Sequence, residues 1–362
     1  MTDSNVTRLQ KRIANAAYDM MEADSESIVY LHALLCHVGL PRRQTDARAF
    51  ERASGGAGIR IEAGSVLRSK GWVPAPLPYG TKPRLVLMHL CAEAVRTKSP
   101  EIDIGHSLND FLAKLGIDNN GRAYGRFRSQ MEALAVCRMQ FGFVTNERSV
   151  MINTQPISQF EAWVKHDHGT PGLWPGALSL SAEFYQALID HAVPLDPRAI
   201  SALQGSALSL DIYTWLAHRL CRIRKDNGIP LYWKNLRDQF GQEYKESKDF
   251  KREFLKSMSN ALSVYPDAKV EQVTGGIKLY PSPPPIKKNS VVVKSFPTSI
   301  PSLNVSEKAL ETVRLVAPGW DKYALLADWR EWHLNKDLVS PTNPDKAFLA
   351  WAKKYTKGKA PI

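Results

Sequence analysis

The sequence predicts an α+β fold that is mainly helical, and three observations predict it. The 362-residue chain is 44% hydrophobic, as is ordinary for a globular protein, and its length suggests two or three domains. Apolar residues recur at helical spacing through most of the chain, and short alternating segments between them are typical of strands. One succession of helix and strand patterns occurs twice. We therefore expect small sheets set among many helices.

Residues 1–75 are expected to form a helical N-terminal region that ends in a basic, glycine-rich segment. Leu9 and Ile13 are spaced for one helix face, and helical spacing continues to about residue 40. Residues 42–78 contain a glycine cluster followed by an alternating segment at 59–61, which indicates a turn and short strands. The cluster lacks the Lys-Ser/Thr pair of a phosphate-binding loop, so we interpret it as a turn.

A nine-residue pattern then occurs twice, as LNDFLAKLG at residues 108–116 and as WKNLRDQFG at residues 233–241. Both copies have large apolar residues at the first, fourth and eighth places and glycine at the ninth. This spacing places three apolar side chains on one stripe of a helix. We expect each glycine to end its helix in the left-handed conformation.

The two copies also have matching neighbours. A long amphipathic helix and a short strand precede each copy, and a turn, a second basic helix and an alternating hairpin segment follow it. The order helix, strand, helix, turn, helix, hairpin is that of a winged helix-turn-helix. The sequence therefore predicts tandem winged helix-turn-helix domains, at residues 76–170 and 171–285.

A linker and a small helical module complete the predicted organisation. Residues 286–302 are basic and spaced by prolines, which is typical of a semi-rigid spacer. Residues 303–362 carry apolar side chains at helical spacing and form the predicted helical C-terminal module.

The charge of the chain favours a polyanionic partner. Lys and Arg number 48 against 36 Asp and Glu, a formal net charge of +12, which favours nucleic acid or an anionic membrane. An apolar span of about 20 residues and a basic amphipathic surface helix are both missing, which argues against the membrane. The N-terminus lacks the apolar run of a secretory signal, so we expect a cytoplasmic protein. The four scattered cysteines form no C-x-x-C pair and predict reduced core thiols, with no metal and no cofactor.

The second helix of each predicted domain is the candidate DNA-binding element. In a helix-turn-helix this helix lies in the major groove, so one face packs and the other offers donors to phosphates and base edges. Apolar stripes mark the packed faces, with Lys251 falling nearer the apolar side of the second helix. The candidate contacts on the outer faces are Arg122, Arg126 and Ser129 in the first helix and Lys248, Arg252, Lys256 and Ser259 in the second.

Any amphipathic helix has a charged outer face, so a purely solvated surface is the alternative. The small number of acidic residues able to pair these charges favours nucleic acid.

Five further residues are weaker candidates. Lys234 and Arg237 belong to the second nine-residue copy, and Arg138, Lys269 and Lys278 belong to the hairpin segments. Two interpretations of the hairpin residues stay open: they contact phosphates as wing residues, or they are solvated edge-strand charges that discourage aggregation.

An enzymatic alternative rests on residues 166–168, His-Asp-His. Some replication proteins nick DNA with a metal-binding His-x-His pair and a nucleophilic tyrosine. The middle residue of such a pair is apolar and lies in a buried strand, whereas Asp167 is charged and precedes a glycine- and proline-containing turn. We therefore expect no enzymatic activity.

With these residues laid out, the chain resembles the RepA-type plasmid replication initiator family over roughly residues 30–285. The matching stretches are LPRR at 40–43, PYGTKPRL at 78–85, SLNDF at 107–111 and LSLDIYTWLAHRL at 208–220. The segments at 317–321 and 344–348 resemble an accessory module of such proteins.

The resemblance implies winged-helix domains that bind direct repeats in the double-stranded DNA of a plasmid origin and help to open an adjacent AT-rich region. It also implies recruitment of the host initiator or the replicative helicase, and a homodimeric form that represses the protein's own gene. The alternative is a winged-helix transcriptional repressor without a role in initiation.

Overall fold

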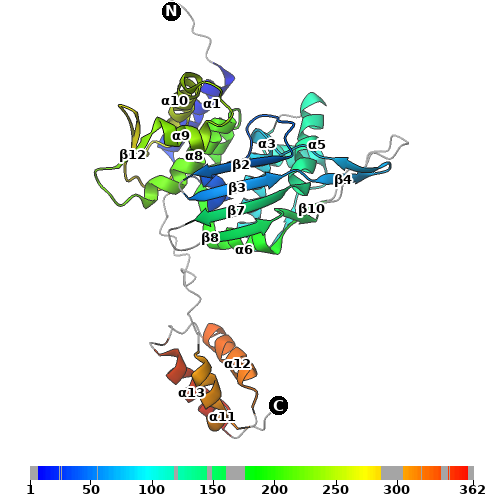
Figure 1. Cartoon of the computed structure of the whole chain (residues 1–362), viewed down its shortest axis with the longest axis vertical. Helices are drawn as coiled ribbons and strands as arrows, with labels where there is room; N and C mark the ends of the chain where they lie inside the picture. Colours follow the sequence, from blue (N-terminus) through cyan, green and yellow to red (C-terminus); the bar gives the residue numbers. More distant parts are fainter. Residues whose placement is uncertain are drawn as a thin grey trace, which may run out of the picture. The chain divides into compact units, whose positions relative to one another are not determined.

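The computed structural model describes residues 7–23, 25, 27–54, 56–117, 121–144, 149–159, 176–286, 305–318, 320–335, 341 and 343–357. Two compact units make up the chain, Met1–Lys287 and Lys288–Ile362 (Figure 1). Many helices and several small sheets are present, which confirms the mixed and mainly helical fold class. None of the helices in these described ranges is long and apolar enough to cross a membrane.

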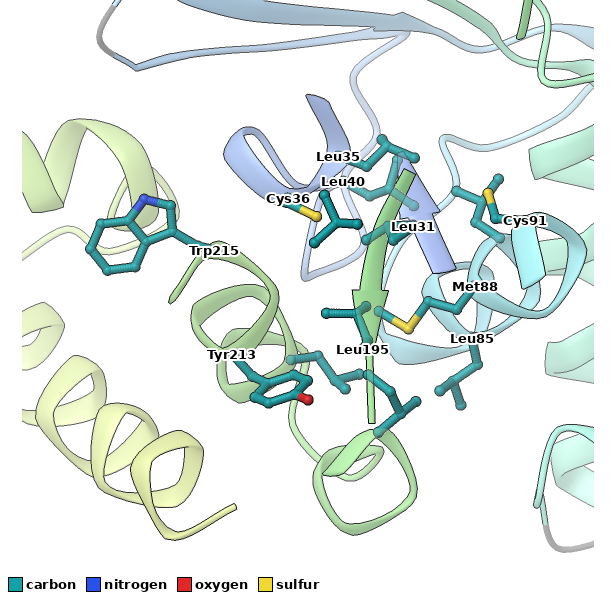
Figure 2. Close-up of a cluster of buried hydrophobic side chains, with 14 of the residues drawn as sticks. Leu31, Leu35, Cys36, Leu40, Leu85, Met88, Cys91, Leu195, Tyr213 and Trp215 are labelled. Atoms are coloured by element: carbon teal, nitrogen blue, oxygen red, sulfur yellow. The ribbon is translucent and has the colours of Figure 1, made fainter. Parts of the chain in front are cut away.

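The core of the larger unit surrounds an antiparallel pair of short strands, β1 (Val29–His32) and β11 (Ala192–Leu195). This pair lies between helices α3 (Thr81–Thr97) and α8 (Ala207–Arg219), as Figure 2 shows. The labelled side chains around it are all buried: Leu31, Leu35, Cys36, Leu40, Leu85, Met88, Cys91, Leu195, Tyr213 and Trp215. Helix α8 is buried on all sides from residue 208 to 217, which is typical of a helix at the centre of a core.

Strand β1 differs from the helix that the sequence predicts through residue 40. The N-terminal region instead consists of α1 (Arg8–Glu22), then β1, then the short helix α2 (Ala33–His37). The capping box of Thr7 and Gln10 begins α1, which packs on α7 (Pro197–Leu203). The strand was not predictable from local spacing, because its partner lies far along the chain.

Four antiparallel strands form the largest sheet, in the order β2-β3-β7-β8 (Figure 1). They are β2 (Ala49–Ser54), β3 (Ala57–Glu62), β7 (Arg138–Val144) and β8 (Ser149–Thr154). The alternation expected at residues 59–61 is present, since the first and third of these side chains are buried and the second is exposed. A separate hairpin, β4 (Ser65–Arg68) and β5 (Gly71–Pro74), follows β3.

The first predicted winged unit has its helices where they were expected, but its strands pair differently. Helices α4 (Leu108–Lys114) and α5 (Gly121–Val136) follow strand β6 (Glu101–Asp103). The hairpin β7–β8 pairs with β3 from the N-terminal region and not with β6. Strand β6 pairs instead with β10 (Ala177–Leu180), which also pairs with β9 (Ile157–Gln159). Helix α6 (Ala182–His191) comes after β10.

The second predicted unit has the expected order and closes its own sheet. After α8 and a 3-10 turn (Leu220–Arg222) come β12 (Ile229–Tyr232), α9 (Trp233–Phe240) and α10 (Ser247–Ser263). The hairpin of β13 (Val270–Val273) and β14 (Gly276–Leu279) follows, and the sheet order is β12-β14-β13. The strand before α9 is thus bonded directly to the hairpin after α10.

The two repeated glycines end their helices in different ways. Gly116 has a φ of 64°, the left-handed conformation that was expected. Gly241 has a φ of −111°, so the expectation of a left-handed residue is wrong there. A Cβ at Gly241 would lie 2.6 Å from Cγ and 2.8 Å from the carbonyl oxygen of Arg237. Lack of space, and not backbone handedness, requires glycine at this position.

In its described residues the smaller unit has three helices, α11 (Glu307–Val316), α12 (Lys322–Asn335) and α13 (Pro344–Tyr355). Their buried faces form a separate core of apolar and aromatic side chains: Leu310, Val313, Leu325, Leu326, Trp329, Phe348 and Ala352. Ser306 caps α11, as its hydroxyl accepts a hydrogen bond from the amide of Ala309.

Candidate DNA-binding surface

Helix α10 packs through an aromatic stripe and leaves its opposite face to solvent. Phe250, Phe254 and Met258 are buried, as the sequence predicts. The ring of Phe254 lies 5.6 Å from that of Phe240 and 6.0 Å from that of Trp233, centroid to centroid. These contacts hold α9 and α10 together and fix which face of α10 points outward.

The outward face of α10 carries Lys248, Arg252, Lys256 and Ser259, all exposed. Arg252 is partly neutralised, because its guanidinium lies 3.1 Å from Asp249 Oδ1 and 3.5 Å from Glu253 Oε1. The expectation that few acidic residues pair with this face is therefore wrong for Arg252. Within the part of the chain that the structure describes, Lys248 and Lys256 form no ion pair. Lys251, expected nearer the apolar side, is exposed, with its ammonium 5.1 Å from the ring centroid of Trp233.

Helix α9 contributes one exposed cation and one structural one. Lys234 is exposed at the start of the helix. The guanidinium of Arg237 donates to the carbonyl oxygens of Tyr244, at 3.4 Å, and Lys245, at 2.9 Å. Arg237 therefore holds the turn that leads from α9 into α10.

The hairpin candidates differ in their surroundings. Lys269 is exposed at the start of the second hairpin. Lys278 stands opposite Glu271 in the β13–β14 register, and its ammonium lies 5.2 Å from the ring centroid of Tyr280. The hydroxyl of Tyr280 donates to Glu271 Oε2 at 2.7 Å, so Lys278 shares its surroundings with a carboxylate. Because β14 is the inner strand of the β12-β14-β13 sheet, Lys278 is not an edge-strand charge, and the nearby carboxylate partly offsets its charge.

The candidate contacts of the first unit lie on α5 and β7. On α5, Phe127, Met131 and Leu134 are buried, whereas Arg126 and Ser129 are exposed. The side chain of Arg122 lies outside the described residues. Arg138 is exposed in β7, opposite Glu62 of β3. Because β7 is an inner strand of the sheet, Arg138 does not lie on a free wing.

Sequence reasoning missed a buried network of charged residues in the larger unit. The guanidinium of Arg84, on α3, donates to both oxygens of Asp211, on α8, at 2.7 and 2.9 Å. It also donates to the carbonyl oxygens of Leu40, Pro41 and Gly80. Burial raises the pKa of Asp211, but the charge and hydrogen bonds of Arg84 outweigh burial and hold the pKa below its ordinary value.

Two more arginines extend this network to the turn between α9 and α10. Arg42 lies 3.3 Å from Asp211 Oδ2 and 2.7 Å from Glu243 Oε2, and it also donates to the carbonyl oxygen of Phe240. Arg52, on β2, lies 3.3 Å from Glu243 Oε1. Burial, together with the charge of Arg42, lowers the pKa of Arg52 to about 10. Glu243 therefore fixes the turn that precedes α10 to β2 and to the core.

Three of the stretches that carry the family resemblance meet in this network. Arg42 comes from 40–43, Arg84 from 78–85 and Asp211 from 208–220. These residues contact one another inside the larger unit and do not lie on α10. Asp211, a carboxylate within the apolar run of α8, was the signal that could have predicted a buried ion pair.

The His-Asp-His sequence at residues 166–168, which raised the enzymatic alternative, lies outside the described residues. Among the residues that are described, no group of three or more His, Cys, Asp or Glu side chains could hold a metal ion. Cys36, Cys91 and Cys137 are buried, and burial raises the pKa of Cys91 and of Cys137 to about 12.

The fold and this surface define a class: a mainly helical α+β protein that presents an exposed cationic helix beside a three-stranded sheet. Residues 77–234 match the family model described as plasmid encoded RepA protein. The match confirms the resemblance to RepA-type plasmid replication initiators. It supports the interpretation of this chain as a replication initiator. The matched stretch runs from just before α3 to the start of α9, and α10 lies beyond it.

Other comparisons add little to this assignment. No curated protein matches the chain. A crystal structure of selenomethionine derivatives of domains 2 and 3 of RctB is similar at a TM-score of 0.42 and 13% identity, over 69% of this chain and 98% of that one. A second structure of RctB domains 2–3 has a TM-score of 0.41 and 12% identity, over 68% of this chain and 96% of that one.

Proposed function

We propose that this protein is a cytoplasmic plasmid replication initiator that binds direct repeats in double-stranded origin DNA through two winged-helix domains. The exposed cationic face of α10 carries this proposal. The helix has 17 residues and is about 25 Å long at 1.5 Å per residue, a size that the major groove admits. Lys248 and Lys256 lie on its outer face with no acidic partner among the described side chains.

The surrounding elements support a winged-helix assignment for the second unit. Strand, helix, turn, helix and hairpin follow one another from β12 to β14, and the strand pairs with the hairpin. In such a domain the helix in the position of α10 enters the major groove. Helix α5, with Arg126 and Ser129 exposed, is the corresponding helix of the first unit.

Two such helices on one chain suit a long DNA repeat, because successive major-groove faces recur about every 34 Å. Opening the neighbouring duplex needs no catalytic group, since bending stress from several bound copies is relieved at weakly stacked steps. We therefore propose that the protein promotes local opening without nicking DNA. We further propose that it recruits the host initiator or replicative helicase, and that a homodimeric form represses its own gene.

Substitutions on α10 test the proposal directly. We expect Lys248→Ala and Lys256→Ala each to weaken binding to DNA that flanks the protein's own gene. Each change should reduce the slope of log K against log salt by about 0.9, because each variant neutralises one phosphate fewer. Arg96→Ala is a matched control, because Arg96 is an exposed arginine at the far end of α3 that pairs with Glu93. Unchanged affinity and slope in both lysine variants would contradict the assignment of α10.

Two further assays separate the proposed function from its alternatives. A plasmid that carries only this gene and its flanking DNA should replicate in a permissive host, whereas a plain repressor would not support replication. Supercoiled DNA of the same region, incubated with the protein and a divalent metal, should stay intact. A covalent adduct between a tyrosine and DNA would contradict the non-enzymatic proposal.

A further inference from the structure

Arg42 and Arg43 are neighbours in the chain with different surroundings. Arg42 is buried between Asp211 and Glu243 and is fixed there by the charged network. Arg43 is exposed, and its guanidinium carbon lies 5.4 Å from the ring centroid of Tyr244, a residue of the turn before α10. The buried arginine therefore positions the exposed one beside the start of α10, where the aromatic ring supports it.

On its other side, Arg43 is connected to α5. The next residue, Gln44, accepts a hydrogen bond from the hydroxyl of Tyr79 at 3.3 Å. The backbone amide of Tyr79 in turn donates to Gln130 Oε1, on α5, at 2.7 Å. A continuous series of contacts thus leads from the turn before α10, through residues 43 and 44, to α5. In Figure 1 the segment is part of the dark blue loop that leads into β2, beside α3.

The α5 end of this series is also cationic. Arg126 is exposed on α5, and Lys82 lies in the first turn of α3. Burial, and secondarily the charge of Arg126, lower the pKa of Lys82. A bound anion would counter the effect of the Arg126 charge on Lys82.

The charged side chains between residues 43 and 48 are not equally available to an anionic partner. The guanidinium of Arg48 donates to the carbonyl oxygen of Ala75 at 2.6 Å and to the carbonyl oxygen of Ala63 at 2.8 Å. Asp46 is exposed and subtracts one charge from the segment. Arg43 is therefore the residue of this segment with an exposed and preoriented cation.

We infer that Arg43 contacts the DNA phosphate backbone between the two helices proposed to enter the major groove, on a surface that Lys82 and Arg126 continue toward α5. This inference rests on the proposed function and goes beyond it, since Arg43 lies on neither helix and precedes the stretch that matches the family model. The ligand is the backbone of double-stranded DNA, recognised by charge and not by base sequence. Arg43 would join the two helix sites into one binding surface.

The test compares Arg43→Ala, Arg43→Lys and the control Arg96→Ala in the full chain. The probes are a DNA fragment from the region flanking the protein's gene and a 30-base-pair duplex of mixed sequence. We expect Arg43→Ala to reduce the salt slope by about 0.9 on both probes. Hydroxyl-radical footprints on the flanking fragment should lose protection between the two helix sites and keep it at both ends. Arg43→Lys, which keeps the charge but not the planar stacking, should retain most of the slope.

The outcomes separate this inference from the proposed function. A full footprint and an unchanged slope for Arg43→Ala, together with a reduced slope for Lys248→Ala, would overturn the inference alone. A wild-type chain that protects no DNA would overturn the proposed function and the inference with it. A thermal unfolding midpoint for Arg43→Ala equal to that of the wild type shows that the effect is on binding and not on folding.

Discussion

The guanidinium groups of three arginines and the carboxylates of Asp211 and Glu243 meet inside the larger unit. The arginines exceed the carboxylates by one charge, and hydrogen bonds to backbone carbonyls explain how this excess is stable there. Each arginine has a backbone carbonyl partner as well as a carboxylate: Leu40, Pro41 and Gly80 for Arg84, Gly39 for Arg52 and Phe240 for Arg42. Carbonyl dipoles stabilise the surplus positive charge, since hydrogen bonds offset the cost of burying an ion, although Nε of Arg52 has no hydrogen-bond partner among the described residues. Space is equally tight, because a Cβ at Gly39 would lie 2.8 Å from Asp211 Oδ1.

Histidines buried as neutral rings predict a loss of stability in mild acid. Burial, and secondarily the charge of His191, lower the pKa of His32 to about 4. Its Nδ1 accepts a hydrogen bond from the amide of Leu34, and its ring lies between those of Phe141 and Phe184. The unfolded chain takes up this proton near pH 6.5 and the folded chain only near pH 4, so stability falls as pH decreases through that window.

We therefore expect His32→Asn to show a weaker pH dependence than the wild type. Asparagine keeps an acceptor for the amide of Leu34 but does not titrate. Urea unfolding between about pH 7.5 and 4.5 should show a slope smaller by up to about 1.4 kcal/mol per pH unit, the value for one proton. The comparison is between slopes, since the variant also loses ring packing. Equal slopes would mean that His32 does not contribute to acid sensitivity.

At the scale of elements, the junction between α9 and α10 is held by close contacts on both sides of the turn. Arg237 donates to the carbonyl oxygens at the end of the turn, and the amide of Gly241 donates to the carbonyl oxygen of Arg237 at 2.6 Å. Glu243 connects the same turn to Arg42 and Arg52. The direction of α10 is therefore set by the turn as much as by the helix's own apolar stripe.

Two glycine substitutions should change the free energy of unfolding in opposite directions. Gly241→Ala would force a Cβ into Arg237 and should lower the free energy of unfolding by about 1–3 kcal/mol. Gly125→Ala, in the middle of α5, meets no atom within 4 Å and should raise it by about 0.5–1 kcal/mol. Chemical denaturation of the two variants beside the wild type measures both. A stabilising Gly241→Ala would show that the turn can shift at little cost.

Local patterns predicted elements well and long-range pairings poorly. The helix expected at 233–241 and the basic helix expected after it correspond to α9 and α10, because helical spacing and helix ends are encoded within a few turns. The pairing of Val29 with Leu195 and the addition of β3 to the β7–β8 hairpin join distant segments, and no local spacing specifies them. The exposed cations of α10 were predictable from the same periodicity, whereas the position of Arg43 depends on a partner far along the chain.

The whole molecule consists of two units with separate cores. Buried clusters are confined to one unit or the other, and the smaller one depends on Trp329 and Phe348. The segment between them is proline-spaced in sequence, which is typical of a tether. Each unit therefore has the apolar contacts that it needs to fold by itself.

This organisation predicts that the units unfold independently. Residues 1–287 alone should keep the urea midpoint of the larger unit in the full chain, and residues 288–362 alone should show a helical circular dichroism spectrum. Thermal scans of the full chain should equal the sum of the scans of the two fragments. A midpoint that drops when the smaller unit is removed would show that the two cores stabilise each other.

Deletion genetics would give misleading results inside the larger unit. A fragment that ends near residue 205 would retain Arg42, Arg52 and Arg84 but lack Asp211 and Glu243, leaving three buried cations without their counter-ions. Removing one partner of a buried ion pair costs about 3–5 kcal/mol, comparable with the whole stability of many domains. Failure of replication in such a truncation would not by itself assign DNA binding to α10, because the same truncation removes both α10 and the counter-ions of the buried arginines. Single substitutions at exposed positions are therefore the way to assign roles within residues 1–287.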